Sequence, residues 1–279
     1  MLLPTPSVSV CVPVAVPAGH LGATVRSVLD QTMPDLEVVV VDEPGCTAGA
    51  EVARASRDPR VRAARGGPAN SAEGLTHAVQ LARAPLVKLV RCGDLLHPRC
   101  LELQAGPMDM DAGLAMVAAR WHLIDEHGRT LLPRRGLTRL TGLHNGVQVA
   151  RRVLRDGANP LGGPSGVLVR REALLGAGGW RDDLTPVRDL DMWMRLLQSG
   201  DFMGLPEPLA AVRVIRDGGR ARDRRDARRA WRALVGEWHG SGAYPFRAVD
   251  RTVGRLRGAT RRARRRALYA VARVPAGAA

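Results

Sequence analysis

The side chains best suited to chemistry in this sequence are a few carboxylates and arginines that follow hydrophobic segments. Asp42 ends a valine-rich segment, Arg91 and Asp94 follow another, and Asp189 and Asp191 lie at the start of a helical pattern. A carboxylate within hydrogen-bonding reach of a hydroxyl can take up its proton. An arginine can hold a phosphate through two parallel hydrogen bonds. These residue types are suited to proton abstraction and anion binding, provided that the fold brings them together.

The segments that carry these residues alternate between predicted strands and helices. Apolar residues recur with strand spacing at 8–14, 37–42, 61–65 and 86–90, and with helical spacing at 21–29, 48–56 and 72–82. The β-branched run at 37–42 is typical of a parallel strand covered on both faces. The order βαβαβαβ predicts an α/β fold, with a mostly parallel sheet flanked by helices.

The end of the valine-rich strand is the first expected binding position. An open parallel sheet binds ligands beyond the carboxyl ends of its strands. This rule places Asp42 at a binding crevice, with Pro13 and Val14 on the same wall as packing residues or as ligand contacts. A second interpretation makes Asp42 a cap on the turn that follows its strand.

Beyond Gly93 the pattern is less regular. We predict a helix from residue 98, a strand near 114–119, a Gly- and Pro-rich loop at 159–166 and a strand at 167–169. Thr185 and Pro186 are typical of a helix start, with threonine as the N-cap and proline at the first helical position. The face of this helix expected to be buried carries Leu190, Trp193, Met194 and Leu197. Gly200 is expected to end it.

The charge of the chain is concentrated at one end. Lys and Arg number 42 against 27 Asp and Glu, a net charge of +15, and residues 218–279 hold 17 of the arginines against four acidic residues. We therefore predict a nearly neutral body at 1–217 and an arginine-rich helical extension at 218–279, with basic amphipathic helices at 227–235 and 261–273 joined by a Gly/Ser stretch at 240–243. The extension is interpreted either as a solvated appendage or as a contact for an anionic membrane surface or an acidic partner.

Several classes of protein are disfavoured by the same composition. A nucleic-acid-binding protein is not expected, because the body is nearly neutral and the extension has few aromatic residues for base stacking. The four cysteines form no C-x-x-C pair, which favours a reducing compartment. The apolar N-terminus lacks a basic region and is interrupted by prolines, so a signal peptide is not expected. We predict a cytoplasmic protein, peripheral at the inner membrane surface if the extension binds lipid.

Short motifs then occur in order along residues 8–216. Together they resemble the family 2 glycosyltransferases of GT-A fold, which use a nucleotide-diphosphate sugar. The resemblance rests on the segments 12–14, 27–32, 35–42, 86–98, 124–129, 164–170, 178–180, 189–197 and 206–210. It implies a GT-A-like domain at 1–217, with a nucleotide half at 1–95 and an acceptor half at 96–217.

The resemblance also implies roles for individual residues. Asp189 matches the general base of inverting members, with Asp191 as its rival, although either carboxylate could simply complement the helix dipole. Asp42 matches the residue that contacts the nucleotide base, beside Pro13 and Val14. Asp94 would contact the ribose, the sugar or a residual metal ion. The expected acceptor-binding residues are Pro164, Ser165, Trp180 and Trp193, of which the two tryptophans could instead be core residues.

The sequence departs from the family pattern at the metal site. Members carry Asp-x-Asp or Asp-Asp after the central strand to hold a divalent ion, whereas here Arg91 stands first and only Asp94 remains. The histidine of a later Arg-x-His pattern is also missing after Arg213. A site for Mg²⁺ or Mn²⁺ is therefore incomplete. We hypothesise that Arg91, with Arg213 or Arg216, supplies the positive charge instead; the alternative is that Arg91 is a solvent-facing loop residue.

The function expected from these observations is transfer of a sugar, with inversion, from a nucleotide-diphosphate donor to an acceptor hydroxyl. The acceptor would be a glycan, a lipid carrier or a small metabolite. The alternative is a degenerate glycosyltransferase fold that binds a nucleotide or a partner without transfer, or that has been recruited to other chemistry.

Overall fold

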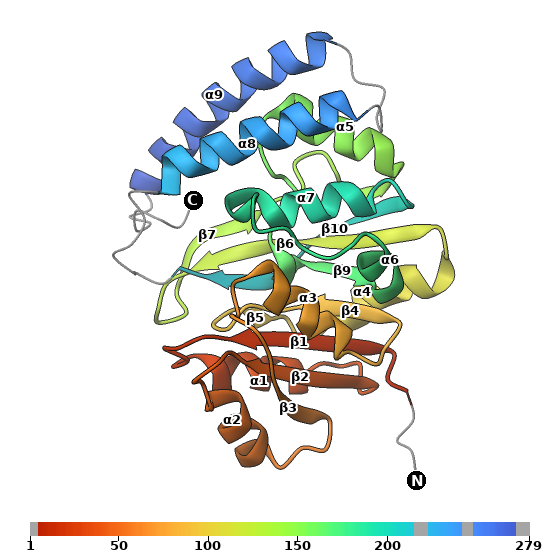
Figure 1. Ribbon diagram of the computed structural model, residues 1–279, viewed down its shortest axis with the longest axis vertical. Helices are drawn as coiled ribbons and strands as arrows, with labels where there is room; N and C mark the ends of the chain where they lie inside the picture. Colours follow the sequence, from red (N-terminus) through yellow and green to blue (C-terminus); the bar gives the residue numbers. More distant parts are fainter. Residues whose placement is uncertain (1–4, 215–222, 242–247, 272–279) are drawn as a thin grey trace.

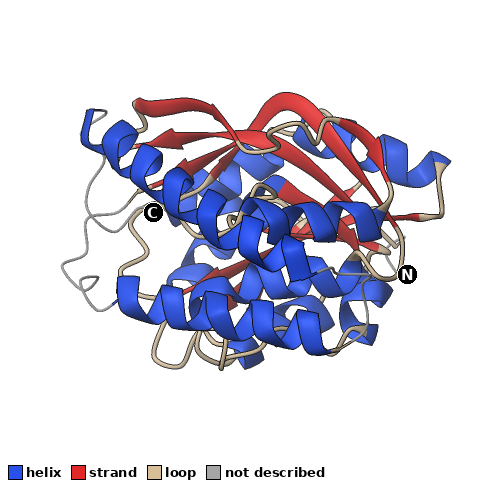
Figure 2. Cartoon of the chain, turned by 90° about the horizontal axis from the view of Figure 1, so that it is seen from above, coloured by secondary structure: helices blue, strands red, loops and turns tan. Residues whose placement is uncertain are grey.

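The computed structural model describes residues 5–214, 223–241 and 248–271. One ten-stranded sheet runs through these residues, in the order β3-β2-β1-β4-β9-β6-β10-β5, with β7 beside β6 and β8 beside β10. Figure 2 shows the long helices lying alongside the twisted strands. The α/β class and the mostly parallel first half of the sheet are as predicted.

The first half of the chain follows the predicted order closely. Its elements are β1 (Val8–Val14), α1 (Leu21–Leu29), β2 (Leu36–Asp42), α2 (Ala48–Ser56), β3 (Val61–Arg65), α3 (Ala72–Gln80) and β4 (Leu86–Leu89). Strand β1 pairs in parallel with β2 and with β4, and β2 pairs in parallel with β3. The carboxyl ends of these four strands therefore meet at one edge of the sheet, which we call the carboxyl edge.

The second half of the chain completes the sheet with mixed pairing. Its elements are β5 (Leu95–Leu96), α4 (Cys100–Met110), β6 (Leu114–Ile124), β7 (Thr130–Arg135), β8 (Gly142–His144), α5 (Gly146–Asp156), η1 (Pro164–Gly166), β9 (Val167–Arg170), α6 (Arg171–Gly176), η2 (Thr185–Val187), α7 (Arg188–Leu196) and β10 (Asp201–Arg213). Strand β9 is antiparallel to β4 and β6, while β10 is parallel to β6. The predicted strand near 114–119 continues to Ile124.

The start and end of α7 differ from the prediction. Thr185 begins a 3-10 turn, and its hydroxyl donates to the carbonyl of Asp182 instead of capping α7. The helix proper begins at Arg188 and ends at Leu196. Gly200 lies in the turn to β10, where a Cβ atom would come within 2.4 Å of the carbonyl oxygen of Gly113. The requirement for glycine there is close packing and not the end of the helix.

Two hydrophobic clusters cover the two faces of the sheet. Val38 and Val40 of β2 belong to the cluster that includes α1 and α4, and Val39 and Val41 belong to the cluster that includes α3, α5 and α7. Alternate residues of a strand point to opposite faces, so a strand covered on both sides must be apolar throughout. This arrangement confirms the interpretation of the valine-rich run.

The basic C-terminal segment forms α8 (Asp223–Gly240) and α9 (Ala248–Val271). Ala230, Leu234 and Trp238 of α8 are buried in the same cluster as α3, α5 and α7. Helix α9 packs on α5, and both helices lie at the end of the molecule opposite to β3 (Figure 1). In the described part of the chain, no helix is long and apolar enough to cross a membrane. The predicted Gly/Ser joint falls partly outside the described residues.

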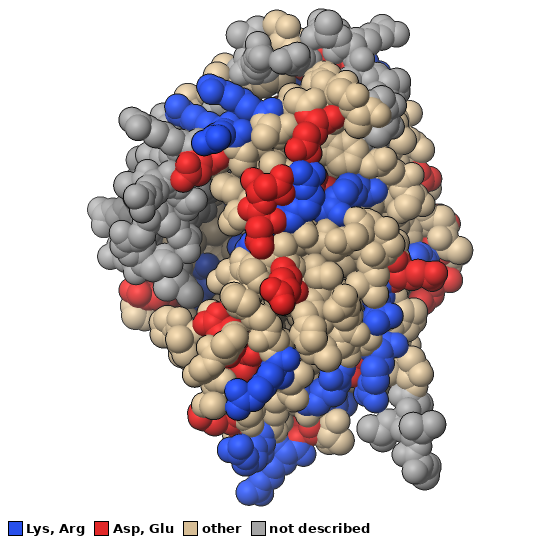
Figure 3. Space-filling model, in the orientation of Figure 1, with Lys and Arg blue, Asp and Glu red and all other residues tan. Residues whose placement is uncertain are grey.

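Ion pairs fix α9 against α5. The carboxylate of Asp250 is buried and lies 3.0 Å from Nε of both Arg151 and Arg155. Asp156 lies 3.0 Å from Arg261 of α9. Several arginines of this region thus face carboxylates of the same chain. Over the face shown in Figure 3, basic and acidic side chains are interspersed on the body.

Candidate active site

Asp42 lies at the carboxyl edge, but its carboxylate faces α2. Oδ1 accepts a hydrogen bond from the backbone N–H of Gly49 at 2.7 Å, and Oδ2 accepts one from that of Ala50 at 3.0 Å. Asp42 is buried, and a Cβ atom on Gly49 would lie 2.7 Å from Oδ1. Both oxygens therefore satisfy N–H groups at the start of a helix, which have no partners within the helix. This is the capping role given above as the second interpretation.

Glu43, the next residue, joins two loops of the carboxyl edge. Its Oε1 accepts from the N–H of Val16, after β1, at 3.3 Å, and its Oε2 accepts from the N–H of Ala69, after β3, at 3.2 Å. Pro13 and Val14 beside it are buried, and Val14 packs in the hydrophobic core. Glu43 was not predicted from the sequence, although the acidic pair of Asp42 and Glu43 at the end of a buried strand was a signal that could have found it.

Asp94 is buried and links three segments of the chain. Its Oδ2 accepts from the hydroxyl of Ser165 at 2.5 Å, and its Oδ1 accepts from the backbone N–H of Arg213 at 2.9 Å. The Ser165 oxygen also accepts from the backbone N–H of Arg91 at 3.2 Å. Burial raises the pKa of Asp94, and the hydrogen bonds lower it only in part. Asp94, Ser165 and the adjoining Pro164 are thus buried, and the Asp94 carboxylate connects the loop after β4 to η1 and to the end of β10.

The guanidinium of Arg213 holds loops together. Nε donates to the carbonyl of Gly93 at 2.8 Å, and Nη1 donates to the carbonyls of Asp125 at 2.9 Å and Glu126 at 2.8 Å. These bonds tie the loop after β4 to the turn between β6 and β7. They use three of the five N–H groups of this guanidinium. Arg216 lies outside the described residues.

The residues near Asp94 do not fit a divalent metal ion. Mg²⁺ needs several oxygen ligands in near-octahedral geometry, but both carboxylate oxygens of Asp94 already accept hydrogen bonds from the protein. Arg91, which lies three residues before Asp94 in this loop, is a cation and cannot serve as a ligand. No group of three or more His, Cys, Asp or Glu side chains within 5–214, 223–241 and 248–271 could hold a metal ion.

Asp189 and Arg91 meet at the carboxyl edge although 98 residues separate them in the sequence. Nη2 of Arg91 donates to Oδ2 of Asp189 at 2.5 Å, and the indole Nε1 of Trp180 donates to Oδ1 at 3.2 Å. The Asp189 side chain is 13% exposed and that of Arg91 is 54% exposed. The Asp189 charge raises the pKa of Arg91. A half-exposed cation after β4 therefore contacts a carboxylate of α7 that solvent can still reach.

Asp191 faces the other side of α7. It is 1% exposed and lies 2.8 Å from Nη2 of Arg195 and 3.9 Å from Nη1 of Arg181. Burial raises the pKa of Asp191, and the arginines lower it in part. The two carboxylates two residues apart thus have different surroundings, and only Asp189 is at the carboxyl edge beside Arg91.

The predicted acceptor-side tryptophans are buried. Trp180 is 5% exposed and Trp193 is 2% exposed, with the Trp193 indole donating to the carbonyl of Gly162 at 3.0 Å. Neither ring offers a face for an acceptor to stack on. Trp121 of β6, which the sequence analysis did not select, is half-buried, and Cβ atoms on Gly136 and Gly162 would clash with its ring. Glycine at both positions therefore leaves the space that this ring occupies.

Comparisons with known proteins agree with this architecture. The model of the family described as "Glycosyltransferase like family 2" matches residues 5–216. An uncharacterised protein of Mycobacterium tuberculosis (strain CDC 1551 / Oshkosh) is 28% identical over 217 residues, which cover 75% of this chain and 67% of that protein.

Solved structures of S. aureus TarS share the fold. The TarS 1–349 crystal structure aligns with a TM-score of 0.65 at 15% identity, covering 88% of this chain and 68% of that one. The same TarS segment in complex with UDP-GlcNAc aligns with a TM-score of 0.64 at 15% identity, covering 88% and 69%. At this identity the likeness concerns the fold, while the family model covers most of the chain. The chain belongs to glycosyltransferase-like family 2 and is a glycosyltransferase with a GT-A-like fold.

Proposed function

We propose that this protein is an inverting glycosyltransferase that moves a sugar from a nucleotide-diphosphate donor to an acceptor hydroxyl, with Asp189 as the general base. The observation that carries the proposal is the contact between Arg91, from the loop after β4, and Asp189, from α7. It brings an anion-binding group of the nucleotide half to a proton-accepting group of the acceptor half. TarS, which shares the fold, has been crystallised with UDP and with UDP-GlcNAc.

In this proposal a single displacement transfers the sugar. The acceptor oxygen forms a bond to the anomeric carbon on the face opposite to the diphosphate, the bond from that carbon to the diphosphate oxygen breaks, and the hydroxyl proton passes to Asp189. The base must lie within hydrogen-bonding reach of the acceptor. Trp180 supports this role, because its indole N–H fixes Oδ1 of Asp189 and leaves Oδ2 as the oxygen that releases Arg91 and takes the proton.

The leaving diphosphate needs positive charge, which we assign to Arg91. A guanidinium can bind phosphate oxygens through two hydrogen bonds, and it needs no ligand set of its own. Arg91 is half-exposed and bonded to Asp189, whereas the Arg213 guanidinium is bonded to three carbonyls. Among these two arginines we therefore assign the phosphate contact to Arg91, and we propose that transfer does not need Mg²⁺ or Mn²⁺.

We further propose which parts of the chain would surround the nucleotide and the acceptor. Backbone groups at Pro13 and Val14, with the loops that Asp42 and Glu43 hold, would form the nucleotide wall. The acceptor, a glycan, a lipid carrier or a small metabolite, would approach past η1, where Pro164 and Ser165 shape the floor and the half-buried Trp121 offers an aromatic edge.

The test is the Asp189→Asn variant. Loss of the general base should lower the transfer rate by about 10²- to 10⁴-fold, while calorimetry with UDP- and dTDP-sugars should show donor affinity within about threefold of wild type, because the amide keeps the size of the side chain. Asp109→Asn, at an exposed position of α4, is the control. Retained transfer by Asp189→Asn would contradict the assignment of the base.

A second candidate function is nucleotide binding without transfer. The observation in its favour is that Asp94, the carboxylate that remains of the expected metal motif, has a protein hydrogen bond at each of its two oxygens. Under this hypothesis wild-type protein binds a nucleotide sugar in calorimetry, and the donor remains intact after long incubation with candidate acceptors. Release of nucleoside diphosphate that depends on an acceptor would exclude it.

We also propose that the C-terminal helices contact an anionic membrane surface. Arg228, Arg229 and Arg232 of α8 and Arg257 and Arg264 of α9 are exposed. Basic helices bind anionic lipid surfaces through such side chains, which would suit a lipid-linked acceptor and a cytoplasmic protein at the inner membrane surface. Cosedimentation with phosphatidylglycerol vesicles, and not with phosphatidylcholine vesicles, is expected. Equal sedimentation of a variant with glutamine at the three α8 positions would contradict the role of α8.

A further inference from the structure

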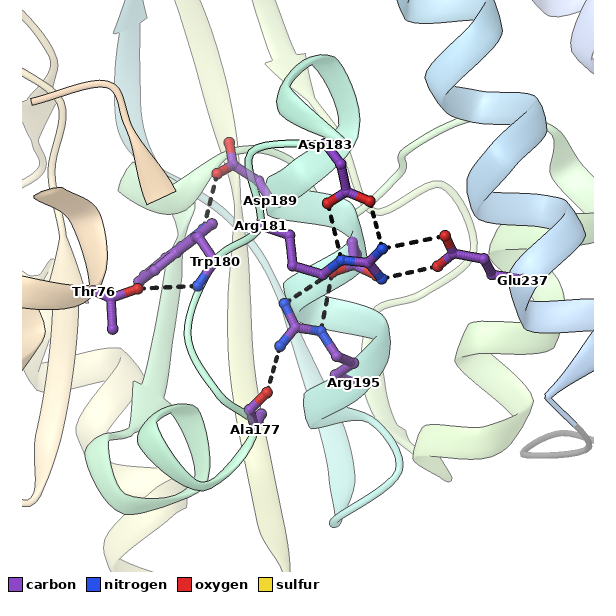
Figure 4. A network of polar contacts seen from close by, with 9 residues as sticks. Thr76, Ala177, Trp180, Arg181, Asp183, Asp189, Arg195 and Glu237 are labelled. Carbon is purple, nitrogen blue, oxygen red and sulfur yellow. Dashed lines mark hydrogen bonds and ion pairs between the residues drawn. The ribbon is translucent and has the colours of Figure 1, made fainter. Parts of the chain in front are cut away.

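A cluster of ion pairs connects α8 to the loop that precedes α7 (Figure 4). Arg181 of this loop donates from Nη1 to Oε2 of Glu237 at 2.8 Å and from Nη2 to Oε1 of Glu237 at 3.2 Å. It also donates from Nε and Nη2 to the two oxygens of Asp183, at 3.1 and 2.6 Å. Two-point pairing of this kind fixes the orientation of a guanidinium as well as its position.

The residue next to Arg181 holds the proposed base. The indole of Trp180 donates to Asp189, and the Trp180 backbone N–H donates to the hydroxyl of Thr76 at 3.1 Å. Gly178 and Gly179 come immediately before it with φ angles of 84° and 73°, in the region where glycine meets little steric resistance. The two glycines permit the turn that brings Trp180 to Thr76 and Asp189, where these two hydrogen bonds and packing in the hydrophobic core hold the residue.

The loop has further anchors on α7 itself. Arg195 donates from Nη1 to the carbonyl of Ala177 at 2.5 Å and pairs with the buried Asp191. Nη1 of Arg181 lies 3.9 Å from Asp191. The loop is thus held to α7 at its start by Arg195, and to α8 by Glu237 just after Trp180.

Helix α8 is a firm support for this contact. Its residues Ala230, Leu234 and Trp238 are buried in the core beside α7, so Glu237 lies next to an anchored tryptophan. Glu237 is itself 45% exposed, and an exposed ion pair contributes little to global stability. Its effect should therefore be local, on the loop that carries Trp180.

From these contacts we infer that Glu237 is a positioning residue for the catalytic base: it holds Arg181, and through the adjoining Trp180 it fixes the orientation of the Asp189 carboxylate. The inference rests on the proposed function. It extends the working active site into α8, beyond residues 5–216 that the family model matches.

The test compares Glu237→Gln with Glu102→Gln. Glu102 is a matched control, because it is also 45% exposed and pairs with an arginine at 3.1 Å, on α4 at the opposite face of the sheet. We expect kcat of Glu237→Gln to fall by about tenfold, less than the roughly 100-fold that a 1 Å misplacement can cost. KM for the donor should stay within about twofold, since Arg91 is untouched, and Glu102→Gln should match wild type. Glu237→Asp should recover part of the loss.

A second readout does not depend on turnover. The indole N–H resonance of Trp180, assigned with a Trp180→Phe sample, reports its bond to Asp189. It should move in Glu237→Gln and in Arg181→Gln, in the direction seen in Asp189→Asn, and should not move in Glu102→Gln. The double variant Arg181→Gln/Glu237→Gln should lose no more kcat than Arg181→Gln alone.

An unchanged Trp180 resonance and unchanged kcat in Glu237→Gln would overturn the inference. Absence of transfer by wild type, with the resonance shifts intact, would overturn the proposed function alone.

Discussion

Asp94 and Asp189, two carboxylates at the carboxyl edge, each accept two hydrogen bonds but differ in the groups that donate them. Asp94 is buried and accepts from the hydroxyl of Ser165 and a backbone N–H, neither of which can leave without disturbing η1 or β10. Asp189 accepts from a rigid indole and from the half-exposed guanidinium of Arg91, which an incoming anion can attract. The difference separates a carboxylate that holds the fold together from one that can exchange its partner for substrate.

The largest expected effect on stability is that of Asp94→Ala. The variant leaves the Ser165 hydroxyl and the Arg213 N–H without their buried acceptor, and each unsatisfied group costs about 1–3 kcal/mol. We expect the free energy of unfolding to fall by about 3 kcal/mol in urea titrations followed by circular dichroism. A loss below about 0.5 kcal/mol would contradict the view that Asp94 connects η1 and β10 through buried hydrogen bonds.

In contrast to Asp94→Ala, Arg91→Gln should affect donor binding more than the stability of the fold. Removing the guanidinium should weaken binding of a nucleotide-diphosphate sugar by about 10- to 100-fold in calorimetry, because a hydrogen bond to a charged group contributes about 1.5–3 kcal/mol. The free energy of unfolding should change by less than about 1 kcal/mol, as for other exposed pairs. Arg99→Gln is the matched control, since Arg99 has the same 54% exposure and is also ion-paired. Equal donor affinity in both variants would remove Arg91 from the site.

Ser165→Ala tests the hydrogen bond between Asp94 and Ser165 by removing its donor. The variant removes one hydrogen bond to Asp94 and the acceptor of the Arg91 N–H. A typical buried hydrogen bond contributes about 1 kcal/mol, so thermal and urea unfolding should show a loss of that size. Donor affinity should change less than in Arg91→Gln. A larger loss of donor affinity in Ser165→Ala than in Arg91→Gln would indicate that Ser165 contacts the donor directly.

The smallest effect is the pH dependence of stability that Asp94 contributes. Burial raises the pKa of Asp94 above its ordinary value of 3.8, so the folded state binds this proton more tightly than the unfolded state. The contribution is therefore complete below pH 3.8 and is lost as the pH rises through the raised value. Relative to Asp94→Asn, the unfolding free energy of wild type should fall over that window. A relative rise would contradict the direction of the shift.

The sequence predicted the first half of the fold best, because its parallel strands are apolar on both faces and its helices are amphipathic. Helix α2 and strand β3 have the predicted bounds. Strands β5, β7, β8 and β10 and helices α5 and α6 were not predicted. Of these, β5, β7 and β8 are short or partly exposed and carry little periodicity. In α8 the arginines obscured a stripe of Ala230, Leu234 and Trp238, spaced by four residues.

Among the site residues, the sequence could identify those that carry charge but not what each one faces. Asp42, Asp94 and Asp189 all come after a strand or at a helix start. Their separate roles depend on partners such as Ser165, which lies 71 residues from Asp94 in the sequence, and Arg91, which lies 98 residues from Asp189. Tertiary packing decides such contacts, and no local pattern encodes them. The burial of Trp180 and Trp193 has the same origin.

We propose that Arg91 supplies the leaving diphosphate with the positive charge that a chelated divalent ion could otherwise provide. The most direct measurement is the initial rate of sugar transfer by wild type and by Arg91→Gln, each in excess EDTA and in manganese chloride. We predict equal wild-type rates in the two conditions and a reduced rate for Arg91→Gln in both. A wild-type rate that EDTA abolishes and manganese restores would contradict the claim.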